Sequence, residues 1–291
     1  MRLVTFSPPS STPRTGALVD GGVVDLTDPG LPADMTELIR LGDPALASAA
    51  EAIEHSAPVA DHDVRIHAPI PRPRKNVMCV GRNYADHAAE FSRSGFDASE
   101  RSAVPEHPVI FTKAASSIIG PEEPILVAND PTGTTDYEGE LGVVIGWSGR
   151  RIQESDANAH VFGYTIVNDV TARDLQHRHV QWFLGKSPDT FCPMGPAIVT
   201  ADELPDIGAS WLRTHVNGEL RQEAPISSLI FDIPSLIRTI SETMLLEPGD
   251  VIATGTPAGA GIGLEPPRFL VPGDRVEVSV DGIGTLGNPV R

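Results

Sequence analysis

Residues 134–146 read TTDYEGELGVVIG, in which two glutamates precede an unbroken apolar run. The run from Leu141 to Ile145 is short, rich in β-branched residues and bounded by glycines, so it predicts a buried strand rather than a helix. Similar short segments recur along a chain that contains 27 glycines and 27 prolines. The sequence therefore predicts a mainly β fold with a few helices.

The two glutamates of this stretch, Glu138 and Glu140, lie two positions apart, and side chains at i and i+2 of a strand point to the same face. They would lie roughly 7 Å apart along the strand, where each anion makes ionisation of the other more costly. One interpretation is a strand end that emerges into water with two solvated carboxylates. The other is a site for a hard divalent cation, which needs convergent oxygen ligands.

Length and composition limit the class of protein. The 291 residues allow one large domain or one and a half, and 40% of them are hydrophobic. No apolar stretch approaches the roughly 20 residues of a membrane helix. The N-terminus MRLVTFSPPSSTPRTG lacks the apolar segment of a secretory signal, and Cys79 and Cys192 make no disulfide framework. We therefore expect a cytoplasmic protein with no membrane partner.

The charge of the chain bears on its partners. A formal net charge of −17 would repel nucleic acid, and the longest basic run is RPRK at 72–75, so we expect no polynucleotide partner. An anionic small molecule would be repelled as well. It would have to be attracted locally, by a metal ion or by a few well-placed arginine and lysine side chains.

The chain is predicted to divide near residue 70. Residues 1–70 contain short apolar pieces and a predicted helix over 34–55, and PIPRPRK at 69–75 follows as a linker, so we expect a small N-terminal α+β domain. Residues 71–291 form a larger unit of successive strand candidates, with hairpin signals at Asn217-Gly218 and Asp281-Gly282. Within it, the irregular polar segment 90–108 is typical of a lid or a disordered loop.

A third carboxylate follows a second strand. VFGYTIVND at 161–169 is predicted as a strand that ends in Asn168 and Asp169, before a predicted helix start in VTARDLQHRH. Asp169 could simply cap that helix. Together with Glu138 and Glu140 it would give three carboxylates on two strand termini, a set that suits Mg²⁺ or Mn²⁺ and leaves positions open for water and substrate.

Two further positions could carry chemistry. His87 and Glu90, in NYADHAAEF, are three residues apart and would share one face of a helical turn. A carboxylate beside an imidazole fixes its tautomer and raises its basicity, although the pair could also be an exposed surface contact. Lys186 follows Trp182, Phe183 and Leu184. It is either an ordinary surface lysine or a partly buried ammonium that binds substrate or a metal-bound carboxylate.

Six motifs, in this order along the chain, resemble the fumarylacetoacetate hydrolase superfamily, and in particular its smaller members, the acylpyruvases and the 2-hydroxyhepta-2,4-diene-1,7-dioate isomerases. They are CVGRNYADHAAE, DYEGELGVVIG, GYTIVNDVTARDLQ, GKSPDTFCPMGP, VNGELRQ and EPGDVIATGTPAGAG, and they span about 77 to 263. Each motif is weak alone, but six in register are specific. The resemblance implies a rolled sandwich of mixed β-sheets with a metal site at one mouth, and a homodimer.

The resemblance also implies roles for individual residues. Carried over by position, Glu138, Glu140 and Asp169 are the metal ligands, and Lys186 contacts the ligand cluster and the substrate. His87 and Glu90 are a dyad on a mobile lid that orders when substrate closes the site. The positions that match substrate contacts are Arg82, Gln176 and Thr256. VGRNYADH offers no counterpart to the further upstream aspartate ligand of the enzyme that names the family, so we expect a three-carboxylate site.

The expected reaction proceeds through a pyruvate enolate. We expect a metal-dependent hydrolase that cleaves the C3–C4 bond of a 2,4-dioxo acid such as fumarylpyruvate or acetylpyruvate, with His87 activating water and Lys186 helping to hold the enolate. Oxaloacetate decarboxylation and isomerisation of an unsaturated dioate reach the same enolate. The presence of both His87 and Glu90 favours hydrolysis, which needs a base. The non-enzyme alternative is a β scaffold or binding module in which a metal is structural.

Overall fold

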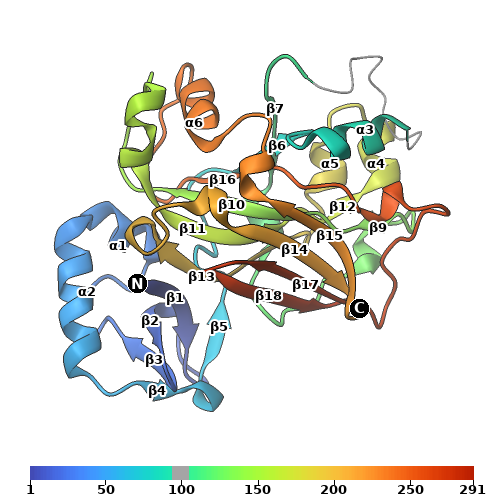
Figure 1. The fold of residues 1–291 in the computed structure, drawn as a ribbon. Coiled ribbons are helices and arrows are strands. Elements are labelled where there is room, and N and C mark those ends of the chain that lie inside the picture. The colour runs from blue at the N-terminus through green and yellow to red at the C-terminus, as the bar shows by residue number, and fades with distance from the viewer. Residues whose placement is uncertain (94–104) are drawn as a thin grey trace.

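The computed structural model describes residues 1–93 and 105–291. Its largest element is a twelve-stranded sheet that runs through the middle of the molecule (Figure 1). In spatial order the strands are β4 (Val59–Ala60), β3 (Gly22–Asp25), β2 (Arg14–Val19), β1 (Arg2–Ser7), β13 (Cys192–Thr200), β11 (Val161–Asn168), β10 (Gly139–Ile145), β16 (Val251–Ala253), β6 (Val77–Gly81) and β7 (Val109–Lys113), while β5 (Arg65–His67) pairs with β1 and β8 (Ile118–Ile119) with β13.

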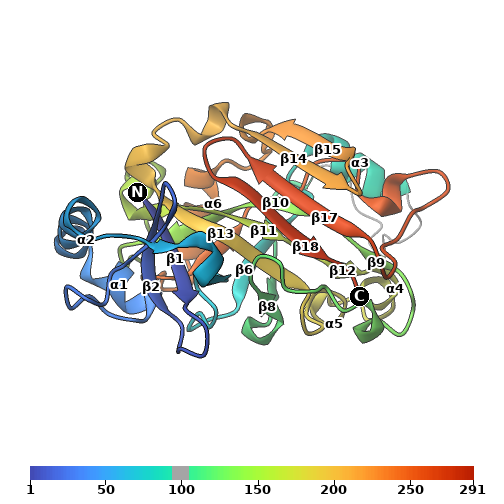
Figure 2. The same ribbon diagram turned by 90° about the horizontal axis from the view of Figure 1, so that it is seen from below.

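A second, four-stranded sheet packs across the first to form a sandwich, as Figure 2 shows. Its order is β15 (Glu219–Pro225), β14 (Trp211–Val216), β17 (Arg275–Val280) and β18 (Gly284–Pro289). Buried aliphatic side chains from both sheets, such as Leu141 and Val278, form one core between them. The mainly β fold predicted from the sequence is confirmed.

Turn chemistry sets the edges of the smaller sheet. Asn217 and Gly218 connect β14 to β15 with φ angles of 53° and 78°, the left-handed conformation that a two-residue hairpin requires. The Asp281-Gly282 signal likewise lies in the connection between β17 and β18. Both hairpin predictions are therefore confirmed.

Within residues 1–93 and 105–291, six α-helices lie around the sheets. They are α1 (Met35–Leu41), α2 (Asp43–His55), α3 (Ala85–Arg93), α4 (Arg173–Arg178), α5 (Phe183–Lys186) and α6 (Ile233–Ser241). The single helix predicted over 34–55 is wrong, because it is two helices. Gly42 lies between them with φ 63°, and Pro44 lies in the first turn of the second helix, where its missing N–H costs no hydrogen bond.

The N-terminal residues continue the large sheet. Strand β1 pairs with β13, with Leu3 opposite Ile198, and α1 and α2 pack beside these strands (Figure 1). One buried cluster contains Leu3 and Leu38 together with Val144 and Val251 of the central strands. A domain boundary near residue 70 stays a prediction, and it would cut through a shared sheet and a shared core.

The predicted irregular segment 90–108 begins later than expected, because α3 extends to Arg93. Residues 94–104, which make up most of that segment, lie outside the described residues. Two short strands, β9 (Thr135–Asp136) and β12 (Thr171–Ala172), pair beside the start of α4. In the described part of the chain, no helix has both the length and the apolar character needed to cross a bilayer.

Candidate metal and substrate site

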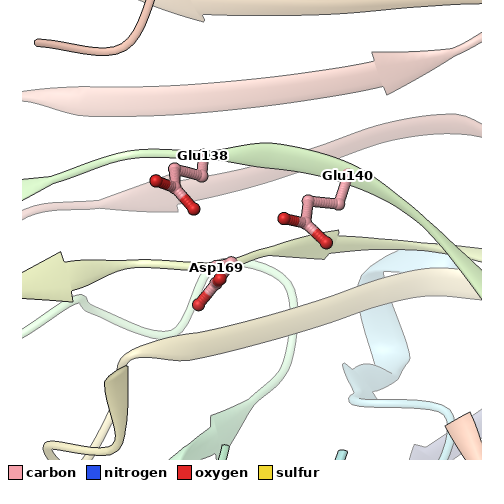
Figure 3. Close-up of side chains that lie close together, drawn as sticks. All are labelled: Glu138, Glu140 and Asp169. Carbon is pink, nitrogen blue, oxygen red and sulfur yellow. The ribbon is translucent and has the colours of Figure 1, made fainter. Parts of the chain in front are cut away.

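Three carboxylates converge where β10 and β11 meet. Glu138 and Glu140 lie on the same face at the start of β10, and Asp169 follows the last residue of β11 (Figure 3). Strand pairing holds them in register, since Gly139 lies opposite Asn168 and the Asp169 N–H donates to the carbonyl of Glu138 at 2.8 Å. One oxygen from each carboxylate lies within 4.8 Å of the others.

All three carboxylates are buried, at 4%, 1% and 0% exposure for Glu138, Glu140 and Asp169. The solvated strand end that the sequence left open is therefore not what the structure shows. Asp169 does not cap a helix either, because α4 begins at Arg173 and its N-cap residue is Ala172.

Three buried cations compensate part of this charge. Lys186 Nζ donates to Glu138 Oε2 at 2.7 Å and to Asp169 Oδ2 at 2.6 Å. Arg173 Nη1 lies 2.6 Å from Glu138 Oε1. Lys113 Nζ lies 2.7 Å from Asp169 Oδ1, an ion pair outside hydrogen-bond geometry. Burial lowers the pKa of Lys186, but the charges of Asp169 and Glu138 outweigh it and raise that pKa above its ordinary value.

Glu138 and Glu140 have opposite electrostatic surroundings. Burial raises the pKa of Glu138, but the cations of Arg173 and Lys186 outweigh it and lower the pKa well below its ordinary value. The pKa of Glu140 is raised well above its ordinary value, first by burial and then by the charges of Asp169 and Glu138. Among the described residues, the Glu140 carboxylate accepts one hydrogen bond, from the N–H of Gly255 at 2.9 Å.

This cluster fits a divalent metal ion. Asp136 is a fourth buried carboxylate, bound by Arg173 Nε at 2.9 Å. Within the described residues, Glu140 is the carboxylate of this cluster with no cationic side chain bound to it. Three clustered carboxylate oxygens are donors that Mg²⁺ and Mn²⁺ prefer. Glu138, Glu140 and Asp169 would hold such an ion.

The predicted dyad lies beside the cluster. His87 and Glu90 are both on α3, and His87 Nδ1 lies 3.1 Å from Glu90 Oε2. Glu90 also accepts the N–H of Gly259 at 3.0 Å, which attaches the helix to the loop before η8 (Gly261–Gly263). Because a carboxylate accepts at Nδ1, the hydrogen is assigned to that nitrogen, and Nε2 is left facing Glu138 Oε1 at 4.0 Å.

One pocket gathers most of the predicted residues. It is lined by Glu138, Glu140, His87, Lys186 and the three predicted substrate contacts Arg82, Gln176 and Thr256. Asp169 and Glu90 are not among the lining residues, but each contacts one of them. Asp169 accepts a hydrogen bond from Lys186, and Glu90 pairs with His87. The cavity volume is about 10 Å³, about the room that one water molecule needs.

The surroundings of Lys186 differ in part from the prediction. The lysine is buried, as one of the two alternatives required, but Phe183 and Leu184 are 43% and 53% exposed and point away from it. The ring beside Lys186 is Phe111, whose centroid lies 5.0 Å from Nζ. Sequence neighbours were a poor guide here, because α5 is a single short turn whose successive side chains point in different directions.

Sequence reasoning missed several residues of the site. Arg173 lies within the quoted motif TARDLQ, and an arginine next to a carboxylate cluster was a usable signal. Asp136 begins the motif DYEGE, but nothing in its pattern shows that it holds Arg173 and accepts the N–H groups of Gly261 and Ile262 at 2.7 and 3.0 Å. Lys113 ends an apolar strand, where a lysine is ordinarily solvated.

Comparison with known proteins identifies the same family that the six motifs indicated. The model of the fumarylacetoacetate (FAA) hydrolase C-terminal family matches residues 76–291. The chain belongs to the fumarylacetoacetate hydrolase family. A relative of this family, oxaloacetate tautomerase YisK of Bacillus subtilis, is 47% identical over 269 residues, which are 89% of this chain and 87% of the relative.

Solved structures of family members share the fold over the whole chain. The fumarylacetoacetate hydrolase of Exiguobacterium antarcticum is 42% identical, with a TM-score of 0.85 over 100% of this chain and 99% of that one. Maleylpyruvate hydrolase from Sphingobium sp. SYK-6, solved in complex with manganese(II) and pyruvate, is 29% identical, with a TM-score of 0.80 over 100% and 98%. The family and fold predicted from the six motifs are confirmed.

Proposed function

We propose that the protein interconverts the enol and keto forms of a 2-oxo acid, with oxaloacetate as the first substrate to test. The observation that carries this proposal is an imidazole, held by Glu90, that faces a buried carboxylate cluster within one pocket. The relative at 47% identity is named an oxaloacetate tautomerase, which supports this reaction over the C–C hydrolysis that the sequence favoured. An enolate underlies both reactions.

The protein's own groups can perform the proton transfer. His87 Nε2 would remove a proton from C3 of the keto form, while Glu90 holds the Nδ1 hydrogen and stabilises the imidazolium that forms. The imidazolium then returns that proton, directly or through a water molecule, to the 2-oxo oxygen, so the reaction needs no further reactant. A divalent cation held by Glu138, Glu140 and Asp169 would supply Lewis-acid stabilisation of negative charge that develops at that oxygen.

Binding would involve the remaining residues of the pocket. Arg82 and Lys186 offer positive charge to the substrate carboxylates, and Gln176 and Thr256 offer hydrogen bonds. Thr256 already accepts from Gln222 Nε2 at 2.7 Å, which fixes its hydroxyl oxygen in place. Because the cavity holds about one water molecule, α3 or the opposite wall must move before substrate binds.

The decisive variant is His87→Gln. The decay of the oxaloacetate enol is followed by ultraviolet absorption with Mg²⁺ or Mn²⁺ present, and kcat is expected to fall by about 100-fold or more, the usual contribution of a general base. Glu90→Gln is expected to cost less, because the imidazole stays in place. Calorimetric titration with Mn²⁺ should show unchanged metal affinity in both variants. Undiminished turnover by His87→Gln would remove the imidazole from the mechanism.

Hydrolysis of an acylpyruvate is the second candidate. Its supporting observation is the same base, which could activate a water molecule instead, together with the manganese and pyruvate in the maleylpyruvate hydrolase structure. Pyruvate release is measured from fumarylpyruvate, acetylpyruvate and oxaloacetate. The comparison distinguishes hydrolysis of an acylpyruvate from decarboxylation of oxaloacetate. Pyruvate from oxaloacetate alone would indicate a decarboxylase, and faster turnover of an acylpyruvate than of the oxaloacetate enol would favour the hydrolase.

Two properties of the assembled protein are also proposals. We propose Mg²⁺ or Mn²⁺ as the cofactor, which a thermal-unfolding titration with each ion after chelation would test. We also retain the homodimer that the resemblance implies, which sedimentation equilibrium would test. A metal-stabilised scaffold without activity is the least supported alternative, since the chain belongs to a family of enzymes and the cluster opens into a pocket.

A further inference from the structure

Three aromatic rings form an arc along the pocket between its two reactive side chains. Lys186 Nζ lies 5.0 Å from the centroid of Phe111, and the Phe111 ring meets Trp182 edge-on at 5.2 Å. Trp182 in turn meets Phe91 edge-on at 5.9 Å, and Phe91 lies 6.4 Å from the ring of His87. The arc therefore runs from the ammonium to the imidazole, and the Arg82 guanidinium lies over its Phe91 ring, 5.2 Å from the centroid.

Each ring of the arc comes from a different element. Phe111 is on β7 and Phe91 on α3, while Trp182 directly precedes α5 and accepts the N–H of Lys186 at its carbonyl, at 2.9 Å. Phe91 forms a buried apolar cluster with Ala260 and Ile262 of the loop around η8, and the partly buried Trp182 packs against it. Trp182 is therefore the middle of the arc and is held by contacts on both sides.

The indole also lies against the backbone of the sheet. A Cβ placed on Gly81, at the end of β6, would lie 2.5 Å from Cζ3 of Trp182, so the ring lies directly against this glycine. This contact limits how far the indole can move toward β6. Trp182 lines the pocket together with Phe91 and Phe111, so its indole occupies space that a bulky substituent would need.

We propose that Trp182 sets the upper size limit of the substrate. In this proposal the wild-type pocket accepts a short 2-oxo acid such as oxaloacetate and excludes one with an aromatic group at C3. Removing the indole opens the arc at its centre, between the two remaining rings, and creates an apolar space for such a group. The inference rests on the proposed 2-oxo acid site but adds the residue that determines its substrate range.

The test compares oxaloacetate with phenylpyruvate, which carries a phenyl group at C3. Ketonisation of both enols is measured with the metal-loaded wild type, Trp182→Ala and Trp182→Phe. The ratio of kcat/KM for phenylpyruvate to that for oxaloacetate is expected to rise at least tenfold in Trp182→Ala and by a smaller factor in Trp182→Phe. The ratio is used because a general loss of activity lowers both values equally.

The matched control is Trp211→Ala, which removes an indole that is 40% exposed on β14, away from this pocket. Its ratio is expected to equal that of the wild type. Thermal unfolding shows whether each variant folds. If Trp182→Ala does not fold, the ratio measured for Trp182→Phe decides the test.

Binding separates this inference from the proposed function. The Kd of phenylpyruvate for each metal-loaded variant is measured by calorimetry, which requires no turnover, and Trp182→Ala is expected to bind it at least tenfold more tightly than the wild type. A wild type that ketonises neither acid would contradict the proposed function alone. A ratio and a Kd that both stay within twofold of the wild type in Trp182→Ala would overturn the size limit.

Discussion

Glu138 and Glu140 have different surroundings although they lie two positions apart on one strand. Glu138 is bound by Arg173 and Lys186, whereas the charges nearest to Glu140 are those of other carboxylates. The alternation of a strand predicted that both side chains share a face. It could not predict this asymmetry, because the cations come from α4 and α5, more than 30 positions further along the chain.

Replacing Glu140 tests its role as a ligand. Glu140→Gln is expected to weaken Mn²⁺ binding by about 100-fold or more, since even changes outside the ligand shell cost 10–100-fold. The metal-free variant should melt at or above the temperature of the metal-free wild type, because a neutral amide replaces a buried carboxylate that has no bound cation. Calorimetry and thermal unfolding measure the two effects. Unchanged Mn²⁺ affinity would exclude Glu140 from the ligands.

Lys113, like Arg173, is a buried cation that sequence reasoning did not identify. Its ammonium donates to the carbonyls of Val170 and Lys186 and pairs with Asp169, so it joins β7 to the turn after β11 and to α5. A lysine at the end of an apolar strand has no local signal that distinguishes it from a solvated one. Its role follows from tertiary packing alone.

Lys113→Met is expected to lower the free energy of unfolding of the metal-free protein by about 3–5 kcal/mol, because it leaves Asp169 with one buried cation fewer. Urea unfolding measures this loss. The control Arg178→Met removes a cation that is 59% exposed and paired with Asp174, and it should cost under about 1 kcal/mol. Equal losses in the two variants would show that the Lys113 pair contributes no more than a surface pair.

At the scale of elements, the sequence predicted whether a segment is a helix or a strand better than it predicted where the segment begins and ends. Short β-branched runs and the two hairpin signals gave the strands, because their period and turn chemistry are local properties. The α1–α2 break was missed although LGDP at 41–44 contains both a glycine and a proline. The pairing of β1 with β13 could not be predicted, since nothing local identifies a partner almost 200 residues away.

The β2–β3 hairpin contains an acid whose ionisation stabilises the fold. Burial raises the pKa of Asp25, but hydrogen bonds from Thr27 and Arg14 outweigh it and lower that pKa below its ordinary value of 3.8. A lowered pKa in the folded state stabilises the protein above pH 3.8, and the contribution disappears as the pH falls through the folded pKa.

Asp25→Asn is therefore expected to destabilise the protein most at neutral pH, and the difference from the wild type should shrink below pH 3.8. Urea unfolding between pH 3 and pH 7 measures it. Asp20→Asn, at the exposed turn of the same hairpin, should change the free energy of unfolding by less than about 0.5 kcal/mol at each pH. A difference for Asp25→Asn that grows toward low pH would contradict the assignment.

At the scale of the whole molecule, charge and site are complementary. The chain carries −17 overall and gathers three buried carboxylates at the site, so a divalent cation held there would attract an anionic substrate that the rest of the chain repels. Composition alone indicates that an anionic substrate would be repelled, and a metal ion bound at the site would overcome that repulsion. The wall of rings that closes the pocket could not be predicted, because its members are spread over residues 91–182.

Removing the N-terminal residues tests whether the predicted domain boundary is real. A chain of residues 71–291 would lack β1, leaving one side of β13 without that partner strand, and would expose the shared cluster around Val144 and Ile198. We expect it to aggregate or to lack a cooperative thermal transition, since an unpaired edge and an apolar patch both promote association. A fragment that is monomeric or dimeric and melts cooperatively would instead support an independent domain.

The candidate metal ligands and the pocket wall come from different parts of the chain, and this separation bears on how proteins of this family diversify. All three candidate ligands lie within residues 138–169, on two strands that pair directly, whereas the arc of rings is contributed by three separate elements. A substitution in the arc leaves the ligands and their pairing untouched, so it can alter which acid is accepted without forfeiting the ion. Single substitutions in the wall can therefore change the substrate range stepwise. A tautomerase and a hydrolase both occur among the relatives of this chain, which is consistent with such changes.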